Sequence, residues 1–483
     1  MGIFRTNDPL QFDDVDGIII DEKAPPAQIV GVGTGVAILV GQFERGPAGV
    51  LTLLTSTPFL EETFGANFSF GGNISLANKR WSTIKIVRAI ASDAALATLT
   101  IDDGDVTDII QFDALDKGIY GNSIKITTEV GTTTGTKYTV QDTSSSAVLD
   151  DEVYDDVVIT AIDSTTFEES KLVNVTVLAT SAEPGAAAAI ALASGSEGSI
   201  ADSDYEDAIA VVSQESSGNI LFLDEYNETK NGFLKIHAGL TQDKMAIMAP
   251  GLSDSAATII TAVASLRDTD GRLIYAANPL QSTIGGTKQY TSPASWYASI
   301  MSQTSAHIDP AFSGNSGFLF GVSGIKFKYT RVEYIAFMEA GVSAFEDDSD
   351  IGIKIKSGIT TQIANSSKVT VLRRRMADFL TNSIAKFLKI YQNDVNSAQK
   401  RLQVKSAIVS FIGRNELLGI LPKDSEVQGG QAKLVDINSL NSDASIALGK
   451  FLILYKQRIF SSMRFIVLRA EIGESVVVTE QDS

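Results

Sequence analysis

The sequence predicts a multidomain protein of mixed α+β and α/β class, with a core α/β domain built from its N- and C-terminal segments. Over residues 201–350, helix-length and strand-length segments alternate, which is typical of a mostly parallel sheet covered by helices. Residues 95–200 instead favour short strands separated by polar turns. Because 483 residues exceed the size of one compact domain, several domains are expected.

Residues 1–28 are expected to form an arm rather than part of a core. Ile18, Ile19 and Ile20 make a brief β-prone run between acidic residues and the pair Pro25 and Pro26. A single short strand is unstable by itself, so this run needs a sheet edge in its own chain or in a neighbouring copy.

Residues 29–94 begin with a glycine-rich apolar stretch and end with a predicted strand at Ile84–Ile90. Gly31, Gly33 and Gly35 have a spacing that suggests a dinucleotide-binding loop, which requires a strand before the glycines and a helix after them. Here the β-prone run Val36–Val40 follows the glycines instead. No cofactor is therefore predicted at this loop.

Residues 95–200 are predicted to be an exposed, acidic, all-β insertion. Strand-length runs such as Ser123–Val130 and Val157–Ala161 alternate with turns. The segment carries 4 Lys and Arg against 18 Asp and Glu. Charge of one sign keeps a surface soluble when many copies stand side by side, so the composition suits an exposed position.

Residues 201–350 offer the place where an enzyme would be sought. Parallel sheets bind ligands at the carboxyl ends of their strands, where Asp224, Pro250 and Asn278 follow predicted strands. However, the Gly-x-Ser-x-Gly motif is missing, and the two histidines, His237 and His307, lie in no motif with metal-ligand spacing. We expect no catalytic residue and no metal. The elements predicted here are helices through Tyr205–Ser213, Thr229–Leu240 and Ser253–Arg267 and strands at Asn219–Leu223, Met245–Ala249 and Arg272–Ala276.

Residues 351–483 contain a predicted amphipathic helix over 369–396. Its apolar residues recur at steps of three and four and so share one face, which must be buried. The opposite face is predicted to carry Arg375, Lys386 and Lys389. This face is either a solvated basic surface or a contact for an acidic partner. The apolar set is Leu372, Met376, Phe379, Leu380, Ile384, Phe387, Leu388 and Tyr391, and Asp378 and Asn382 join the polar face.

Charge and composition exclude several classes of protein. The chain has no cysteine, which excludes disulfides, thiolate nucleophiles and cysteine-ligated metals. No apolar run is long enough to span a bilayer, so no membrane insertion is expected. The net charge is −19, yet residues 351–483 hold 19 Lys and Arg against 11 Asp and Glu. An acidic protein surface fits this basic block better than nucleic acid, because the whole chain repels a polyanion.

Several motifs, in order along the chain, resemble those of contractile tail sheath proteins of bacteriophages and related injection machines. In that family an apolar strand ends at glycine, an Arg-Gly-Pro loop and a Thr-Ser helix start follow, and a later strand closes on Val-Arg. The C-terminal sequence MRFIVLRA is also similar to the family's ending. The matching residues are Gly31, Gly41, Arg45-Gly46-Pro47, Thr55-Ser56, Phe59, Phe64-Gly65, Val87-Arg88-Ala89, Gly118-x-Tyr120-Gly121-Asn122, Ala306-x-x-Asp309 and Gly321–Gly324.

The resemblance implies a non-enzymatic structural subunit of a virion tail. Such subunits would polymerise as stacked six-subunit rings around a tail tube protein, contact baseplate and tail terminator proteins, and contract to drive the tube through the host cell envelope. It implies a division into an N-terminal arm (1–28), a core domain (29–94 plus 351–470), an insertion (95–200), a middle α/β domain (201–350) and a C-terminal arm (471–483, its strand beginning as early as 462). Strand exchange between subunits is expected at Ile18, Ile19, Ile20, Phe465, Val467, Val476, Val477 and Val478, and tube contact at Arg375, Lys386 and Lys389.

Two alternatives remain open at this point. The same subunit could belong to a tail-like bacteriocin or another contractile injection system, because the motifs do not separate these from a phage tail. An enzyme on the middle α/β domain is the alternative of a different class, and a substrate turned over by the chain would favour it.

Overall fold

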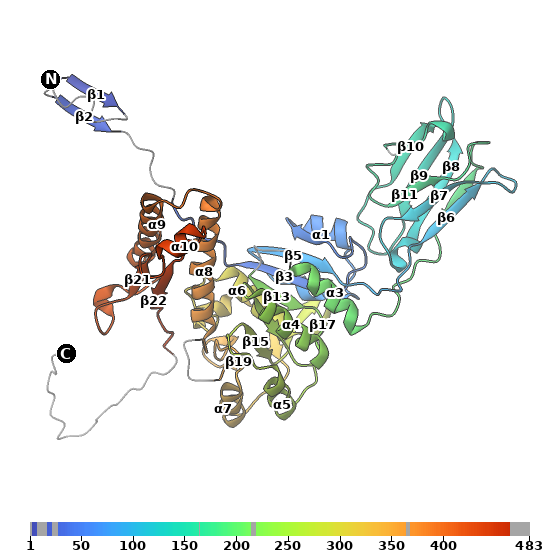
Figure 1. The fold of residues 1–483 in the computed structure, drawn as a ribbon. Coiled ribbons are helices and arrows are strands. Elements are labelled where there is room, and N and C mark those ends of the chain that lie inside the picture. Colours follow the sequence, from blue (N-terminus) through green and yellow to red (C-terminus); the bar gives the residue numbers. More distant parts are fainter. Residues whose placement is uncertain are drawn as a thin grey trace. The chain divides into compact units, whose positions relative to one another are not determined.

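The computed structural model describes residues 2–6, 17–21, 28–163, 165–213, 219–363 and 368–463. Contacts divide the chain into two units (Figure 1). The small unit is Met1–Val32 with Met376–Phe460, and the large unit is Gly33–Arg375 with Ser461–Ser483. Within the large unit we distinguish the insertion, residues 95–200, from the rest, which we call the body.

The body is built on one eight-stranded sheet. Six neighbouring strands run parallel, and an antiparallel strand is added at each edge. Such mixed sheets are common in α/β proteins. In spatial order the strands are β20 (Gly352–Ile355), β19 (Val342–Asp348), β15 (Leu273–Ala277), β14 (Met245–Met248), β13 (Ile220–Leu223), β3 (Val36–Gly41), β5 (Thr83–Arg88) and β4 (Leu51–Leu54).

This sheet corrects the expected domain division. Residues 29–94 were grouped with 351–470, but β3 pairs with β13 and so joins the strands of residues 201–350. Residues 376–460 belong to the small unit instead. The physical reason is that β3, β13, β14 and β15 are all apolar runs buried on both faces, and parallel strands of this kind stabilise one another only side by side.

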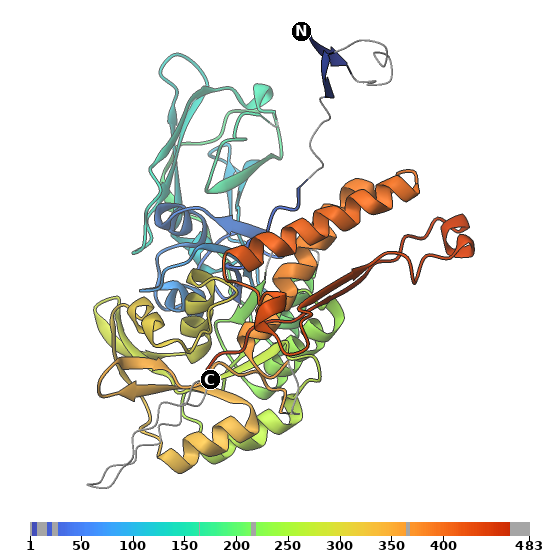
Figure 2. The same cartoon turned by 90° about the vertical axis from the view of Figure 1, so that its left-hand side faces the viewer.

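Helices cover both faces of the sheet (Figures 1 and 2). The predictions of helices within 205–213, 229–240 and 253–267 are confirmed, with ends set by capping side chains. Asn227 accepts a hydrogen bond from the Lys230 amide, and Thr330 forms a capping box with Glu333. The helices are α1 (Thr57–Phe64), α2 (Gly71–Leu76), α3 (Asp202–Val212), α4 (Glu228–Thr241), α5 (Ala256–Leu266), α6 (Pro293–Gln303) and α7 (Arg331–Ala340).

A second, antiparallel sheet leads into α6, the most deeply buried helix of the body. Gly285 and Gly286 both have positive φ and form the turn of its hairpin, a conformation that other residues adopt at a cost. Trp296 on α6 donates its indole N–H to the Thr291 hydroxyl at 2.8 Å. The strands are β16 (Leu280–Ile284), β17 (Thr287–Thr291) and β18 (Val322–Ile325), with β16 in the middle.

The insertion is made of two antiparallel sheets around its own core. Inward and outward residues alternate along its strands, as expected for sheets with one buried face. Phe112, Tyr138 and Phe167 pack with ring centroids 5.7–6.2 Å apart. One sheet has the order β10 (Glu152–Val157), β9 (Thr136–Asp142), β8 (Ile124–Val130) and β12 (Ala187–Ala191), and the other β11 (Val173–Val177), β7 (Asp108–Ala114) and β6 (Thr98–Asp102).

In its described residues the small unit contains two long helices, one short helix and two pairs of strands. Helix α8 (Val371–Leu388) begins in the large unit and continues into the small one, and α9 (Ala398–Leu417) follows it. The rings of Phe379 and Phe411 are 5.9 Å apart, and a Cβ on Gly31 would come within 2.9 Å of the Phe379 ring. The strands are β1 (Gly2–Thr6) and β2 (Gly17–Asp21), paired in parallel, and β21 (Lys433–Asp436) and β22 (Leu454–Gln457), paired antiparallel, with the short helix α10 (Asp443–Ala447) between them.

None of the helices in the described ranges combines the length and the apolar character that crossing a bilayer requires.

Candidate functional site and assembly surfaces

The first candidate site is the carboxyl end of β13, where Asp224 stands. The strand order reverses between β3 and β13, and open α/β sheets bind ligands at such a point. Here the Asp224 carboxylate accepts hydrogen bonds from the Gln42 amide at 2.8 Å and the Tyr205 hydroxyl at 2.7 Å. A Cβ on Gly41 or Gly71 would come within 2.8 or 2.5 Å of that carboxylate. The chain's own side chain therefore fills the crevice, and burial raises the pKa of Asp224 to about 6.

Asn278, at the end of β15, likewise has its side-chain polar atoms hydrogen-bonded within the chain. Asn278 is fully buried, and its amide donates to the carbonyl oxygens of Phe327 at 2.9 Å and Phe345 at 3.0 Å. Its side-chain oxygen accepts from the Phe327 amide at 3.0 Å. Asn278 thus joins three backbone segments, and neither it nor Asp224 is free to hold a substrate.

The two histidines lie far from one another in the sequence and in different surroundings. His237 on α4 is buried, and burial together with the nearby Lys244 lowers its pKa to about 4, so it is neutral at physiological pH. His307 is exposed after α6, and partial burial lowers its pKa. Among the described residues, no group of three or more His, Asp or Glu is arranged to hold a metal ion.

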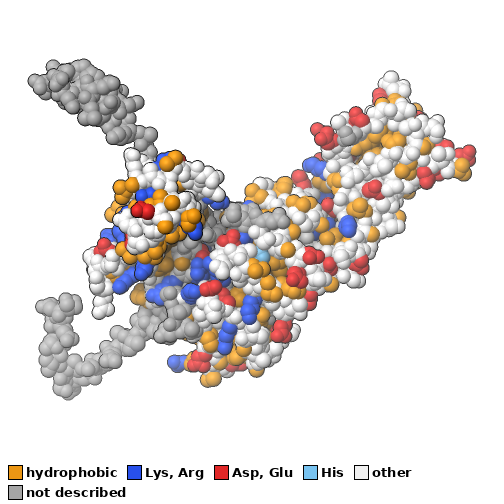
Figure 3. All heavy atoms as spheres, viewed as in Figure 1, with side chains coloured by type: hydrophobic (Ala, Val, Ile, Leu, Met, Phe, Trp, Pro, Cys, Tyr) orange, Lys and Arg blue, Asp and Glu red, His pale blue; other side chains and the backbone are white. Residues whose placement is uncertain are grey.

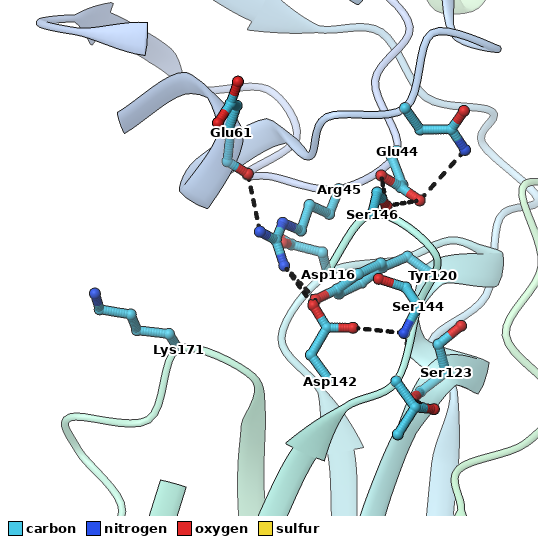
Figure 4. Close-up of polar contacts among 12 residues, drawn as sticks. Glu44, Arg45, Glu61, Asp116, Tyr120, Ser123, Asp142, Ser144, Ser146 and Lys171 are labelled. Carbon is cyan, nitrogen blue, oxygen red and sulfur yellow. Dashed lines mark hydrogen bonds and ion pairs between the residues drawn. The ribbon is translucent and has the colours of Figure 1, made fainter. Parts of the chain in front are cut away.

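A second candidate is a buried polar contact between body and insertion (Figure 4). Arg45, in the loop after β3, donates to the Tyr120 hydroxyl of the insertion and to the Glu61 carbonyl oxygen at 2.9 Å. Tyr120 in turn donates to Asp142 at 2.7 Å, and the Arg45 guanidinium lies 3.5 Å from the same carboxylate. Both members of this ion pair are buried, which is rare unless charges are paired.

Arg88 makes a neighbouring contact at the end of β5. Its guanidinium donates to the carbonyl oxygens of Phe43 at 3.1 Å and Gly46 at 3.0 Å, which belong to the body, and of Lys117 at 2.9 Å, which belongs to the insertion. From the sequence, Arg45 and Arg88 were identified only as residues of the family motifs and not as contacts between body and insertion. Local patterns do not show which distant groups an arginine contacts.

Arg375 does not lie where the helix periodicity placed it. It was predicted on an exposed face of α8, but its side chain is buried and donates to the carbonyl oxygens of Met301 and Thr304, both at 2.7 Å. These carbonyls end α6, and helix C-termini leave such oxygens without partners. Asp378, expected on the same polar face, is also buried. The prediction of an exposed Arg375 is therefore wrong, and its guanidinium serves as a cap for α6.

Comparison with solved structures identifies the fold. The chain superimposes on the sheath tail protein of Desulfitobacterium hafniense with a TM-score of 0.64 and 16% identity, covering 92% of this chain and 100% of that one. The chain has the contractile sheath protein fold. The sheath tail protein of Listeria innocua matches with a TM-score of 0.65, 14% identity and coverage of 89% and 96%, and the contracted helical sheath of the anti-feeding prophage with 0.58, 14%, 95% and 99%. No family model matches the chain, and no curated protein matches it.

The remaining predicted contact residues are the two lysines expected to face the tube and the arm residues expected to exchange strands. Lys386 and Lys389 are exposed on α8 and the turn after it, as the periodicity predicted. Ile18, Ile19 and Ile20 lie in β2, whose partner strand in this chain is β1. The expected C-terminal strand residues, Phe465, Val467, Val476, Val477 and Val478, lie outside the described residues.

The small unit of the sheath fold exposes large apolar side chains. On α9, Leu402 and Val409 are exposed two helical turns apart, and Leu417 is 80% exposed at the helix end. In Figure 3 apolar side chains cover much of the visible surface of this unit. Large apolar side chains that gather on an exposed surface mark candidate contact sites. Other exposed members are Ile390, Val395, Leu418, Leu434, Leu440, Leu448, Leu452 and Phe460.

A groove of about 520 Å³ lies within the small unit, beside the α8–α9 connection. Leu388, Val404 and Phe451 contribute apolar lining, while Lys400 and Arg401 contribute charged groups. Lys400 pairs with Asp394, and Arg401 donates to the Asn396 carbonyl oxygen at 3.0 Å, so the unit holds both cations in place.

Proposed function

We propose that the chain is the structural subunit of a contractile phage tail sheath. The observation that carries this proposal is a sheath fold that extends over 92% of this chain and all of the solved sheath tail protein from Desulfitobacterium hafniense. In the proposed assembly, copies form stacked six-subunit rings around a tail tube protein, between a baseplate and a terminator. Contraction of the stack would then drive the tube through the host cell envelope.

The small unit is the proposed site of contact between copies. Its exposed leucines and valines cost free energy in water, and burial against neighbouring copies would recover about 25 cal/mol for each Å² of apolar surface. The β21–β22 pair has only two strands, which is marginal by itself, so added strands from neighbouring arms would stabilise it. Head-to-tail contacts build closed rings when the rotation between copies closes and open helices when it does not, and stacked six-subunit rings would together form a tube.

Removal of both arms is expected to abolish assembly. The test compares the full chain with a version that lacks residues 1–24 and 471–483, each examined by negative-stain electron microscopy at raised concentration. The full chain is expected to form striated hollow tubes, and the trimmed chain to remain monomeric with unchanged circular dichroism. Monomers from both chains in every salt tested would contradict the sheath proposal, whereas tubes from both would contradict only the role of the arms.

Lys386 and Lys389 are proposed to face the tail tube. Reversing both charges, Lys386→Glu and Lys389→Glu, is expected to weaken binding of tube protein by about 10- to 100-fold, because two attractive charge contacts become repulsive. Self-assembly of the chain should stay intact, because the proposed contacts between copies are the arms and the exposed apolar side chains, not these two lysines. Co-sedimentation with purified tube protein measures this effect. A matched control reverses Lys423 and Lys450, which are also exposed in the small unit. Equal losses in both double variants would show a general charge effect and contradict the assignment.

A second candidate is the same subunit in a tail-like injection particle without a genome. The fold match to the helical sheath of the anti-feeding prophage, over 95% of this chain, favours it. Electron microscopy of particles released by the producing cells separates the two candidates. A DNA-filled head on each tail identifies a phage, and headless tails identify an injection particle.

A further inference from the structure

The insertion leaves the body through a neck of two adjacent chain segments. Ala95 forms an antiparallel bridge with Ser196, and Thr98 forms another with Ala193. The amides of Thr98 and Ala193 donate to each other's carbonyl oxygens at 2.8 and 2.9 Å. A two-stranded ladder keeps its strands in register, but two strands alone bend and twist easily. The neck by itself would therefore let the insertion change its orientation.

A second attachment point joins the body to a different part of the insertion (Figure 4). Arg45 reaches Tyr120 and Asp142, and Asp142 ends β9 rather than belonging to the neck. Beside it, the Ser146 hydroxyl lies 2.9 and 2.8 Å from the two oxygens of Glu44. We call Glu44, Arg45, Tyr120, Asp142 and Ser146 the Arg45 latch.

Charge and burial make the latch hard to open. Arg45 and Asp142 are almost completely buried, and a buried charge that loses its partner is strongly destabilised. Burial also raises the pKa of Tyr120, so its hydroxyl keeps its proton and can accept from Arg45 while it donates to Asp142. Opening the latch would break this chain of hydrogen bonds as a unit.

We propose that the Arg45 latch fixes the insertion at one orientation on the body, so that the two turn as a single rigid piece. Polar contacts between domains of one chain usually permit relative motion. Here the latch, together with the neighbouring contact from Arg88 to the Lys117 carbonyl oxygen, removes the rotations that the neck alone would leave. Arg45 is thus a positioning residue for the insertion. This inference concerns the free subunit and holds whether or not the chain assembles.

The test measures the distance between insertion and body in the full chain. Because the chain has no cysteine, two introduced cysteines can be spin-labelled without background. Val106→Cys, in the exposed turn between β6 and β7, and Glu206→Cys, exposed on α3, supply the labels. The distance distribution from pulsed electron paramagnetic resonance is expected to be narrow. Arg45→Met is expected to broaden it about twofold or more, because the buried carboxylate of Asp142 then loses its charged partner and the latch opens.

The matched control is Lys171→Met. Lys171 pairs with Glu62 at 3.6 Å across the same boundary, but both side chains are exposed, so this pair contributes little and the distribution should stay narrow. A distribution that is already broad with Arg45 present, or one that Arg45→Met leaves unchanged, overturns the proposal. If Arg45→Met does not fold, Asp142→Asn removes the charge that pairs with Arg45, and unchanged width in that folded variant also overturns the proposal.

Discussion

Arg375→Ala is expected to lower the free energy of unfolding of the large unit by about 3–5 kcal/mol. Arg375 is 4% exposed, and its guanidinium donates to the carbonyl oxygens at the end of α6 and to the Thr304 hydroxyl at 3.1 Å. Burial lowers its pKa to about 10, so it remains charged at neutral pH and binds these oxygens strongly. Without the guanidinium, buried carbonyl groups at the end of α6 lose their hydrogen-bond donors. A buried acceptor without a donor costs its full desolvation free energy.

Tryptophan fluorescence in a urea titration measures this loss in the large unit. The chain has two tryptophans, Trp81 and Trp296, and both lie in the body. Arg375→Lys should recover only part of the stability, because lysine lacks the planar fork that reaches two carbonyls. Arg331→Ala, at an exposed position on α7, is the matched control and should change stability by at most about 0.5 kcal/mol. A loss below about 1 kcal/mol in Arg375→Ala would contradict the capping role.

Asp224→Asn is expected to change how stability depends on pH. Burial raises the pKa of Asp224 from 3.8 to about 6, so the folded state binds the proton more tightly than the unfolded state. The contribution of Asp224 to the free energy of unfolding is therefore complete below about pH 4 and is lost as the pH rises through about 6. Relative to Asp224→Asn, the unchanged chain should lose about 3 kcal/mol of stability between about pH 4 and about pH 7.

Urea titrations of both chains at several pH values give this difference directly. Asparagine can still accept from the Gln42 amide and donate to the Tyr205 hydroxyl, so the variant should fold. Asp207→Asn, at an exposed position on α3, is the control and should leave the pH profile close to that of the unchanged chain. If the stability difference between the unchanged chain and Asp224→Asn is constant with pH, Asp224 does not titrate in this range and its predicted contribution to pH dependence is wrong.

Local elements could be predicted well from the sequence, because apolar residues that become buried recur with the period of the helix or strand that carries them. The apolar runs that became β13, β14 and β15 and the helices between them were all located before the structure. The pairing of β3 with β13 was not, because residues 36–41 and 220–223 are separated by the whole insertion and their shared sheet has no local signature. Which strands become neighbours depends on contacts that single-sequence periodicity does not contain.

Arg375 shows the same limit within a single helix. The helical repeat placed Arg375 outside the set of apolar residues, but the conclusion that it meets water assumed that only one face of α8 is covered. The C-terminus of α6 lies there instead and supplies oxygens for a cation. Lys386 and Lys389, farther along the helix, are exposed as the repeat predicted. The resemblance to sheath proteins marked Arg45 and Arg88, but only the structure gave them partners.

The neck of the insertion also bears on how the body folds. Strands β5 and β13 belong to one sheet, yet about 130 residues separate them, and closing so long a loop is entropically unfavourable. The insertion has its own core, with Phe112, Tyr138 and Phe167 at its centre, so it can collapse independently. Once it has done so, the bridge between Ala95 and Ser196 holds the two ends together. The folded insertion then acts as a short connection between the strands of the body. The effective contact order of the body is therefore much lower than the sequence separation of its strands suggests.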